Sequence, residues 1–159
     1  MKLELKNIKH SAFASHETHC YEASLYVDGK RAAIVSNQGT GGCDSVWILG
    51  EGSTRIRNAK LVSAAESSLE SLESWCCEQV NEFLDKRELK RATKKVVVYT
   101  RDGQMYKYNI KPDQLNKLRK RPEDGIFESV RRWLLNENEG CTILNDLPED
   151  EQLELWRKS

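Results

Sequence analysis

The residues with the clearest chemical potential lie in one glycine-rich segment, Asn37–Cys43, which reads NQGTGGC. Glycine has no side chain, so the backbone here can approach a ligand closely and can adopt positive φ angles. Backbone amides in such a loop can also cradle a phosphate. The segment lacks the lysine and the following helix of a P-loop, so a plain turn between strands is the competing interpretation. The candidate partner-binding residues are Asn37, Gly39, Gly41, Gly42 and Cys43.

Histidine and cysteine residues near this loop raise the question of a metal site. All three histidines of the chain, His10, His16 and His19, precede the loop. His16, His19 and Cys20 could supply two imidazoles and a thiolate, and Cys43 a fourth ligand from across a hairpin. In a strand, however, His19 and Cys20 point to opposite faces, and the spacing is not that of a paired zinc motif. We therefore expect no bound metal and no other cofactor.

Two basic runs offer a contact surface for nucleic acid. One is Lys86–Arg91 together with Lys94 and Lys95. Basic side chains neutralise phosphates, and exposed Tyr or Trp rings can stack on bases. The end of a helix attracts Lys and Arg in any case, which explains part of this first run without a ligand. The other set of candidate nucleic-acid-binding residues is Lys117, Arg119, Lys120, Arg121, Arg131 and Arg132.

Composition and motifs exclude several classes of protein. The chain has 159 residues, with 25 Lys and Arg against 25 Asp and Glu, so its formal net charge at pH 7 is zero. Balanced charge argues against a histone-like protein or a polyanion mimic. The sequence contains neither a Gly-x-Ser-x-Gly nor a His-Glu-x-x-His signature, and acid–base catalysis would need residues that only the fold brings together. We therefore predict a protein that is not an enzyme.

The same sequence features predict a cytoplasmic protein. No apolar run approaches the length that crosses a bilayer, and the first residues do not resemble a signal peptide. The five cysteines are odd in number and lack the spacing of a disulfide framework. We accordingly expect free thiols that pack as small apolar groups, and no contact with a membrane.

The elements that must position the glycine-rich loop begin with a hairpin over Cys20–Ser36. Its centre, Asp28-Gly29, is a two-residue turn of the type I′ kind. A strand within Leu3–Phe13 precedes it, and Ser45–Leu49 and Thr54–Arg57 are predicted as two further short strands. Alternation in the hairpin predicts a buried face made of Tyr21, Ala23, Leu25, Val27, Ala32 and Ile34.

A long helix is predicted over Ser63–Arg91. Ser63 and Glu66 form the pattern of a capping box, in which the two side chains satisfy each other's free backbone amides. Acidic residues precede basic residues along the segment, which complements the helix dipole. The predicted buried stripe, at steps of three and four residues, is Leu69, Leu72, Cys76, Val80 and Phe83.

The rest of the chain predicts a second hairpin and short helices. The hairpin spans Lys94–Ile110 around Asp102-Gly103, and one face would carry Val97, Tyr99, Tyr106, Tyr108 and Ile110. Helices follow over Asp113–Leu118 and Ile126–Asn136. A short strand at Cys141–Leu144 precedes a last helix that Pro148 opens.

Together these elements predict an α+β fold in one domain, residues 1–159, with a β-rich part to about residue 62 and a mixed part from about residue 63. An antiparallel sheet of hairpins packs against the long helix, and further short helices lie toward the C-terminus. A helix in either hairpin would contradict this prediction, which depends on side chains that alternate between the two faces of a strand. A solvent-exposed Leu72 would contradict the predicted buried stripe.

Part of the chain resembles a known group of sequences. The pattern E-T-x-C-Y, Y-V-D-G-K and S-N-x-G-x-G-G-C across Glu17–Cys43, together with Ile143–Pro148, resembles small uncharacterised proteins encoded by bacteriophages and plasmids. The resemblance covers about the first third and the last tenth of the chain. It implies an accessory protein of a mobile element that acts in the cytoplasm of a bacterial host. The group has no assigned activity, so no residue role is transferred.

The resemblance and the lack of catalytic motifs lead to one expected function and one alternative. We expect a protein that binds and inhibits a host protein or complex, such as a defence nuclease, in the manner of anti-defence or anti-CRISPR factors. The alternative is a protein that binds nucleic acid or a nucleotide signal through the basic runs or the glycine-rich loop. The sequence leaves open the identity of the partner, the surface that binds it and the oligomeric state.

Overall fold

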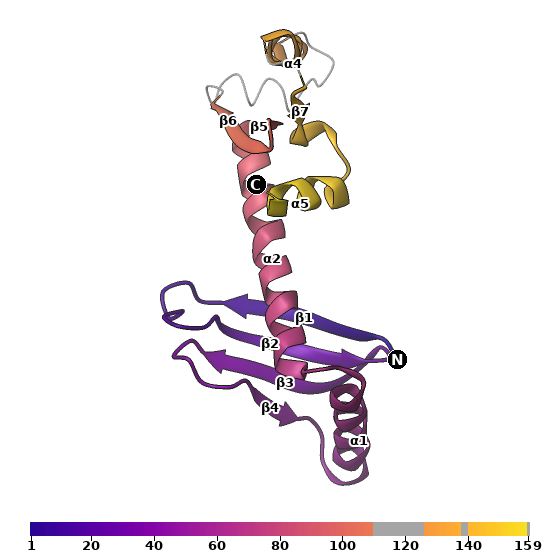
Figure 1. The fold of residues 1–159 in the computed structure, drawn as a ribbon. Coiled ribbons are helices and arrows are strands. Elements are labelled where there is room, and N and C mark those ends of the chain that lie inside the picture. The colour runs from indigo at the N-terminus through magenta and orange to yellow at the C-terminus, as the bar shows by residue number, and fades with distance from the viewer. Residues whose placement is uncertain (110–125, 138–139, 159) are drawn as a thin grey trace. The chain divides into compact units, whose positions relative to one another are not determined.

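The computed structural model describes residues 1–109, 126–137 and 140–158 and has the predicted α+β class (Figure 1). Contacts divide the chain into two compact units, Met1–Phe83 and Leu84–Ser159. The boundary between the units lies later in the chain than the predicted change from a β-rich to a mixed part near residue 62, because two helical segments belong with the first sheet. No helix in the described part of the chain is long and apolar enough to cross a membrane.

The first unit is built on a four-stranded antiparallel sheet in the order β1-β2-β3-β4. Its strands are β1 (Leu3–His10), β2 (Cys20–Val27), β3 (Lys30–Gln38) and β4 (Ser45–Ile48). The first hairpin is confirmed: Asp28 and Gly29 have φ angles of 47° and 77°, the positive values that a type I′ turn requires. β1 and β4 form the two edges of the sheet.

A β-bulge in β3 changes which residues are buried. The register between β2 and β3 shifts between Leu25 and Tyr26, which leaves Ala32 as an extra residue. Beyond the bulge, Ala33 faces inward and Ile34 faces outward, where it is half-buried. The prediction that Ile34 lies on the buried face was therefore wrong. Two consecutive alanines fit either register, so alternation alone could not reveal the extra residue.

Two helices replace the single helix predicted for the middle of the chain. α1 spans Gly52–Ser68 and α2 spans Leu72–Lys95. Thr54–Arg57 was predicted as a strand but forms the start of α1, since four alternating residues are too few to distinguish the two structures. Ser63 lies within α1 and caps nothing. The hydroxyl of Ser71 instead accepts a hydrogen bond of 3.2 Å from the Ser74 amide, which marks the start of α2.

The helices of the first unit cover one face of its sheet (Figure 1). Asn58 of α1 donates a hydrogen bond of 2.9 Å from its amide to the carbonyl of Leu49, which holds α1 at the end of β4. Of the predicted helical stripe, three members are buried, and Leu69 and Phe83 are half-buried. The buried apolar residues of this unit are Tyr21, Ala23, Leu25, Val27, Ala32, Ala33, Val35, Val62, Ala65, Leu72, Cys76 and Val80.

The second unit contains its own sheet, in the order β6-β5-β7. Its strands are β5 (Val96–Arg101), β6 (Gln104–Asn109) and β7 (Thr142–Ile143). The hairpin around Asp102-Gly103 is confirmed, but the prediction of one sheet containing both hairpins was wrong. Turn residues specify each hairpin locally and do not determine which hairpins share a sheet. The predicted helix Asp113–Leu118 and Ile110 lie outside the described residues.

The central strand β5 buries side chains on both of its faces. Val98 packs with Leu89, Leu144 and Leu153, and Val97 packs on the other side with Leu134 and Ile143. The remaining elements of the described residues are α4 (Ile126–Glu137), the short 3₁₀ turn η1 (Leu144–Asp146) and α5 (Glu149–Lys158). The predicted helix over Ile126–Asn136 and the last helix after Pro148 are thereby confirmed.

The side-chain amide of Asn145 links the C-terminal segment to the start of β5, in addition to the pairing of β7 with β5. The Asn145 side-chain oxygen accepts a hydrogen bond of 2.8 Å from the Val98 amide. Its nitrogen donates to the carbonyls of Thr93 and Val96 at 2.9 and 3.2 Å. These bonds satisfy backbone groups at the point where α2 ends and β5 begins.

The buried position of Leu72 leads to the first prediction. We expect Leu72→Asp to lower the free energy of unfolding of the first unit by about 3 kcal/mol or more, because it removes an apolar contact and buries a carboxylate without a cation. Ile56→Asp is the control, since the Ile56 side chain on α1 is 62% exposed and its replacement should cost less than about 0.5 kcal/mol. Chemical denaturation measures both, and equal losses would contradict the assignment of the core.

Candidate functional site

The buried side chain of Asn37, at the end of β3, organises the glycine-rich loop. Its oxygen accepts hydrogen bonds from the Thr18 hydroxyl and the Gly39 amide, both at 2.8 Å. Its nitrogen donates to the Gly42 carbonyl at 2.8 Å and to Oδ1 of Asp44 at 3.0 Å. All of the hydrogen-bonding capacity of this amide is used within the protein. Asn37 therefore holds the loop in place through contacts inside the protein.

Gly39 binds the separate loop that connects β1 to β2 and holds it against the glycine-rich loop. Its carbonyl accepts hydrogen bonds from the backbone amides of His16, Glu17 and Thr18 at 2.9, 3.0 and 3.4 Å. Its φ angle is +83°, and a Cβ atom at this position would lie 2.2 Å from the carbonyl oxygen of Ala14. Glycine is thus required by the close approach of two backbone segments. For this residue, the competing interpretation of a turn with a structural role explains the sequence.

The five candidate residues therefore separate into two groups. Asn37 and Gly39 are buried and make internal contacts, whereas Gly41, Gly42 and Cys43 are exposed. A Cβ atom on Gly42 would meet nothing within 4 Å. Only the exposed half of the loop can contact another molecule.

Next to the loop, the structure brings together a group that the sequence did not indicate. The Tyr21 hydroxyl donates a short hydrogen bond to Oδ2 of Asp44, and the backbone amide of Asp44 donates to the Glu73 carboxylate at 3.3 Å. Burial, followed by the hydrogen bond to Asp44, raises the pKa of Tyr21 above its ordinary value. The residues come from three separate elements, so no local motif could have identified them.

The thiol of Cys76 lies in the same environment. Burial, followed by the nearby negative charge of Asp44, raises its pKa to about 12. A thiol with this pKa remains protonated at neutral pH and is a poor nucleophile. The arrangement is therefore that of a packed structural cysteine. All five cysteines are free.

A cleft of about 260 Å³ opens beside this group, on the inner side of β4. Its apolar surface comes from the two sheet strands at this edge and from the start of α2. Acidic side chains from the loop after β3, from α1 and from α2 surround that surface. The lining residues are Val35, Asp44, Val46, Glu66, Leu72, Glu73 and Cys76.

The histidines considered as metal ligands make other contacts. The rings of His10 and His19 meet edge to face with centroids 5.3 Å apart. Nε2 of His19 lies 2.7 Å from the side-chain oxygen of Asn81 on α2, while His16 and Cys43 are exposed. In residues 1–109, 126–137 and 140–158, no three His, Cys, Asp or Glu side chains are grouped so that they could hold a metal ion.

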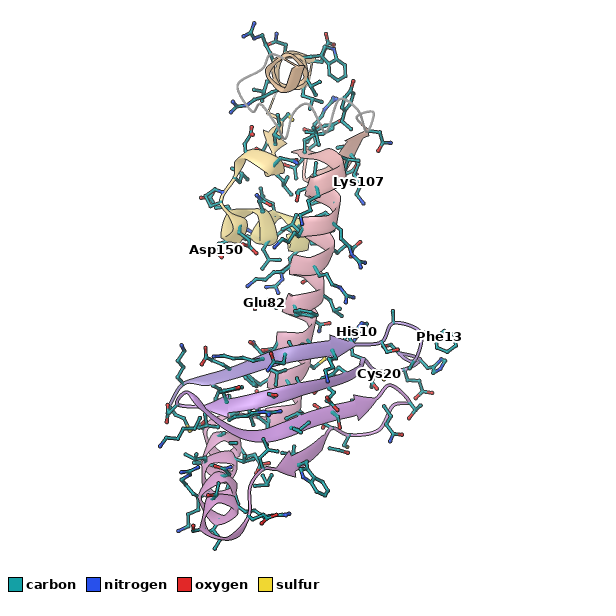
Figure 2. All side chains as sticks on the ribbon, turned by 180° about the vertical axis from the view of Figure 1, so that it is seen from behind. His10, Phe13, Cys20, Glu82, Lys107 and Asp150 are labelled. Atoms are coloured by element: carbon teal, nitrogen blue, oxygen red, sulfur yellow. The ribbon has the colours of Figure 1, made fainter. Side chains whose placement is uncertain are left out.

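Two large apolar side chains of the first unit are strongly exposed. Phe13 is 94% exposed at the tip of the loop between β1 and β2 and points away from the sheet (Figure 2). Trp47 of the edge strand β4 is 66% exposed and lies beside Ile34 on the face of the sheet opposite the helices. Sequence reasoning missed both residues, because an isolated aromatic residue gives no sign of whether it is buried.

The candidate basic residues are only partly described. Arg131 and Arg132 lie exposed on α4, and Arg131 forms an ion pair of 2.8 Å with Asp146. Lys117 and Arg119–Arg121 lie outside the described residues. The units nevertheless differ in charge: the first has 8 Lys and Arg against 11 Asp and Glu, and the second has 17 against 14.

Comparison with known proteins gives no match: no family model, no curated protein and no solved structure is similar to this chain.

The clamp at Gly39 leads to the second prediction. We expect Gly39→Ala to lower the free energy of unfolding by about 2 kcal/mol, since it combines an unfavourable positive φ with a steric clash against Ala14. Gly42→Ala is the matched control and should change stability by less than about 0.5 kcal/mol. Urea denaturation monitored by circular dichroism measures both. Equal stability of the two variants would refute the clamp.

The burial of Cys76 leads to the third prediction. A pKa of about 12, against an ordinary 9.0, lowers the thiolate fraction about a thousandfold at pH 8. We expect iodoacetamide to modify the exposed neighbour Cys77 in the native protein and to leave Cys76 unmodified until denaturant is added. Peptide mass spectrometry distinguishes the two sites. Equal labelling rates in the native state would show that the Cys76 site is open.

Proposed function

We propose that this chain is a non-enzymatic factor that binds a protein of a bacterial host through its first unit and inhibits it. The observation that carries the proposal is Trp47, a large aromatic side chain that is 66% exposed on the edge strand of a hydrogen-bonded sheet. Residues that dominate protein interfaces are most often Trp, Tyr and Arg held on a rigid support.

The surroundings of Trp47 support an interface. Register places Lys6, Ser24, Ile34 and Trp47 in one row across the open face of the sheet. The row begins with a charged side chain and ends with apolar ones. Apolar side chains bordered by polar ones are a usual feature of protein-binding surfaces.

The loop that carries Phe13 provides a second contact point. Three backbone amides of this loop bind the Gly39 carbonyl, and the Ser15 hydroxyl both donates to the Ser11 carbonyl at 2.8 Å and accepts from the Cys20 amide at 2.9 Å. A loop fixed in this way loses little conformational entropy when it binds. The exposed aromatic ring is thus presented to a partner at low entropic cost.

The chemistry of Tyr21, Asp44 and Cys76 favours a binding function over a catalytic one. A nucleophilic cysteine needs a lowered pKa, whereas the pKa of Cys76 is raised to about 12. The hydroxyl of Tyr21 is likewise directed to an internal carboxylate. These contacts stabilise the fold.

The resemblance of the sequence to phage- and plasmid-encoded proteins supports a host component as the target, and a defence nuclease is the target class we propose. An accessory protein of a mobile element gains from blocking such an enzyme, and binding alone is sufficient for this purpose.

A different observation favours a second candidate function, the binding of nucleic acid or a nucleotide by the second unit. That unit has an excess of basic residues, and three of them, Lys90, Arg91 and Lys94, are exposed on the second half of α2. Binding through phosphate contacts would weaken steeply with salt. Electrophoretic mobility shifts at two salt concentrations distinguish this function from protein binding.

The fourth prediction tests the main proposal. We expect the tagged full chain to capture a host protein in a fixed ratio from lysate treated with nuclease, and to protect an infecting phage from a host defence nuclease. Trp47→Ala should weaken capture about 30-fold or more, as expected for loss of a residue worth about 2 kcal/mol.

The matched control is Trp133→Ala, because Trp133 lies in the second unit and is 48% exposed. It should leave capture and protection unchanged. If the chain captures only nucleic acid from untreated lysate, and captures nothing once the lysate is treated with nuclease, the main proposal is contradicted and the second candidate is favoured.

A further inference from the structure

The two edges of the first sheet differ in how they are protected against pairing with another strand. β1 carries Glu4, Lys6 and Lys9, and a register irregularity near Asn7, whose φ is 55°, interrupts its pairing with β2. Charged side chains and bulges are the features by which natural sheets block their edges. β4, with the sequence Ser-Val-Trp-Ile, has no charged residue, no proline and no bulge.

The backbone of β4 is free on the side away from β3. β4 pairs with β3 alone, in regular register from Ser45 to Ile48. Among residues 1–109, 126–137 and 140–158, no hydrogen bond from another segment reaches its outer edge. An extended strand could therefore add to β4 through main-chain hydrogen bonds.

The cleft beside β4 favours an added strand that carries basic side chains. Asp44, Glu66 and Glu73 line it, and none of them forms an ion pair with a Lys or Arg of the described chain. The carboxylate of Asp44 accepts its hydrogen bonds from the neutral groups of Tyr21 and Asn37, so no cation of the described residues compensates its charge. A basic side chain entering the cleft would supply the missing positive charge and lay its methylene groups on the apolar floor.

Alternation along the added strand connects these features. Val46 faces the cleft, while its neighbour Trp47 faces the opposite, open side of the sheet. Side chains of an adjacent strand alternate in the same way. One set would thus meet the acidic cleft and the other would pack beside the indole ring of Trp47.

We propose that β4 binds an extended segment of a partner protein by strand addition, and that this segment alternates basic with apolar side chains. The basic side chains enter the cleft of Asp44, Glu66 and Glu73, and the apolar side chains pack against Trp47. This inference rests on the proposed function and specifies the chemistry of the partner at the same site.

The fifth prediction uses the full chain and a synthetic probe, the peptide acetyl-Val-Lys-Val-Lys-Val-Lys-Val-amide. We expect saturable shifts of the backbone amide NMR signals of Ser45–Ile48 during titration. Glu66→Gln with Glu73→Gln should weaken binding about tenfold, because each partly exposed charge pair is worth a few-fold in affinity. Glu78→Gln is the matched control, since this exposed residue of α2 does not line the cleft, and it should leave affinity unchanged.

Two further peptides test the two parts of the mechanism. A version methylated at every amide nitrogen cannot donate main-chain hydrogen bonds, and we expect it not to bind. A version with Glu in place of Lys should also fail to bind. Equal binding of either peptide, or shifts located on β1 in place of β4, would overturn the proposal.

Two other outcomes would also overturn it. Signals of β4 that shift with protein concentration in the absence of peptide would show that a second copy of the chain occupies the edge. A protein that captures a host partner through Trp47 but does not bind the basic peptide would retain the proposed function and lose only this mode of recognition.

Discussion

The amide of Asn37 is the contact on which the organisation of the first unit depends. With four hydrogen bonds it joins the end of β3 to the loop that precedes β2, to the glycine-rich loop and to Asp44. Because Asp44 is held in this way, the Tyr21 hydroxyl has a fixed acceptor and the cleft beside β4 keeps a carboxylate at its rim. Removing the amide would leave several buried polar groups without partners at once, and such groups are costly in a low-dielectric interior.

The second unit uses the same physical solution in a different place. Asn145 satisfies backbone groups where α2 gives way to β5, and it does so from a short turn near the C-terminus. In both units an asparagine provides donors and acceptors at a point where regular structure ends and the backbone would otherwise lack partners. The two asparagines fix loops and junctions, while apolar packing supplies most of the stability of each unit.

The sequence predicted those elements of the fold that depend on residues close together in the chain. Both Asp-Gly hairpins and the last helices follow from turn residues and periodicity over short distances. The prediction failed where the answer depended on distant residues: the bulge at Ala32, the break between α1 and α2 at Leu69–Ser71, and the division into two sheets. The candidate site shows the same limit. Its glycines were recognisable, but the contacts that make Gly39 internal, and the cleft beside β4, come from segments far apart in the chain.

The shortness of β4 has a consequence for aggregation. Cross-β fibrils need segments of about six or seven residues that can stack repeatedly. β4 has four residues, and it lies between Asp44 and Gly50, whose φ of 90° turns the chain away from the sheet. An edge of this length can receive one strand, but it offers too little backbone to begin a growing fibril. The shortness of β4 therefore limits the risk of fibril growth that an unprotected edge would otherwise carry.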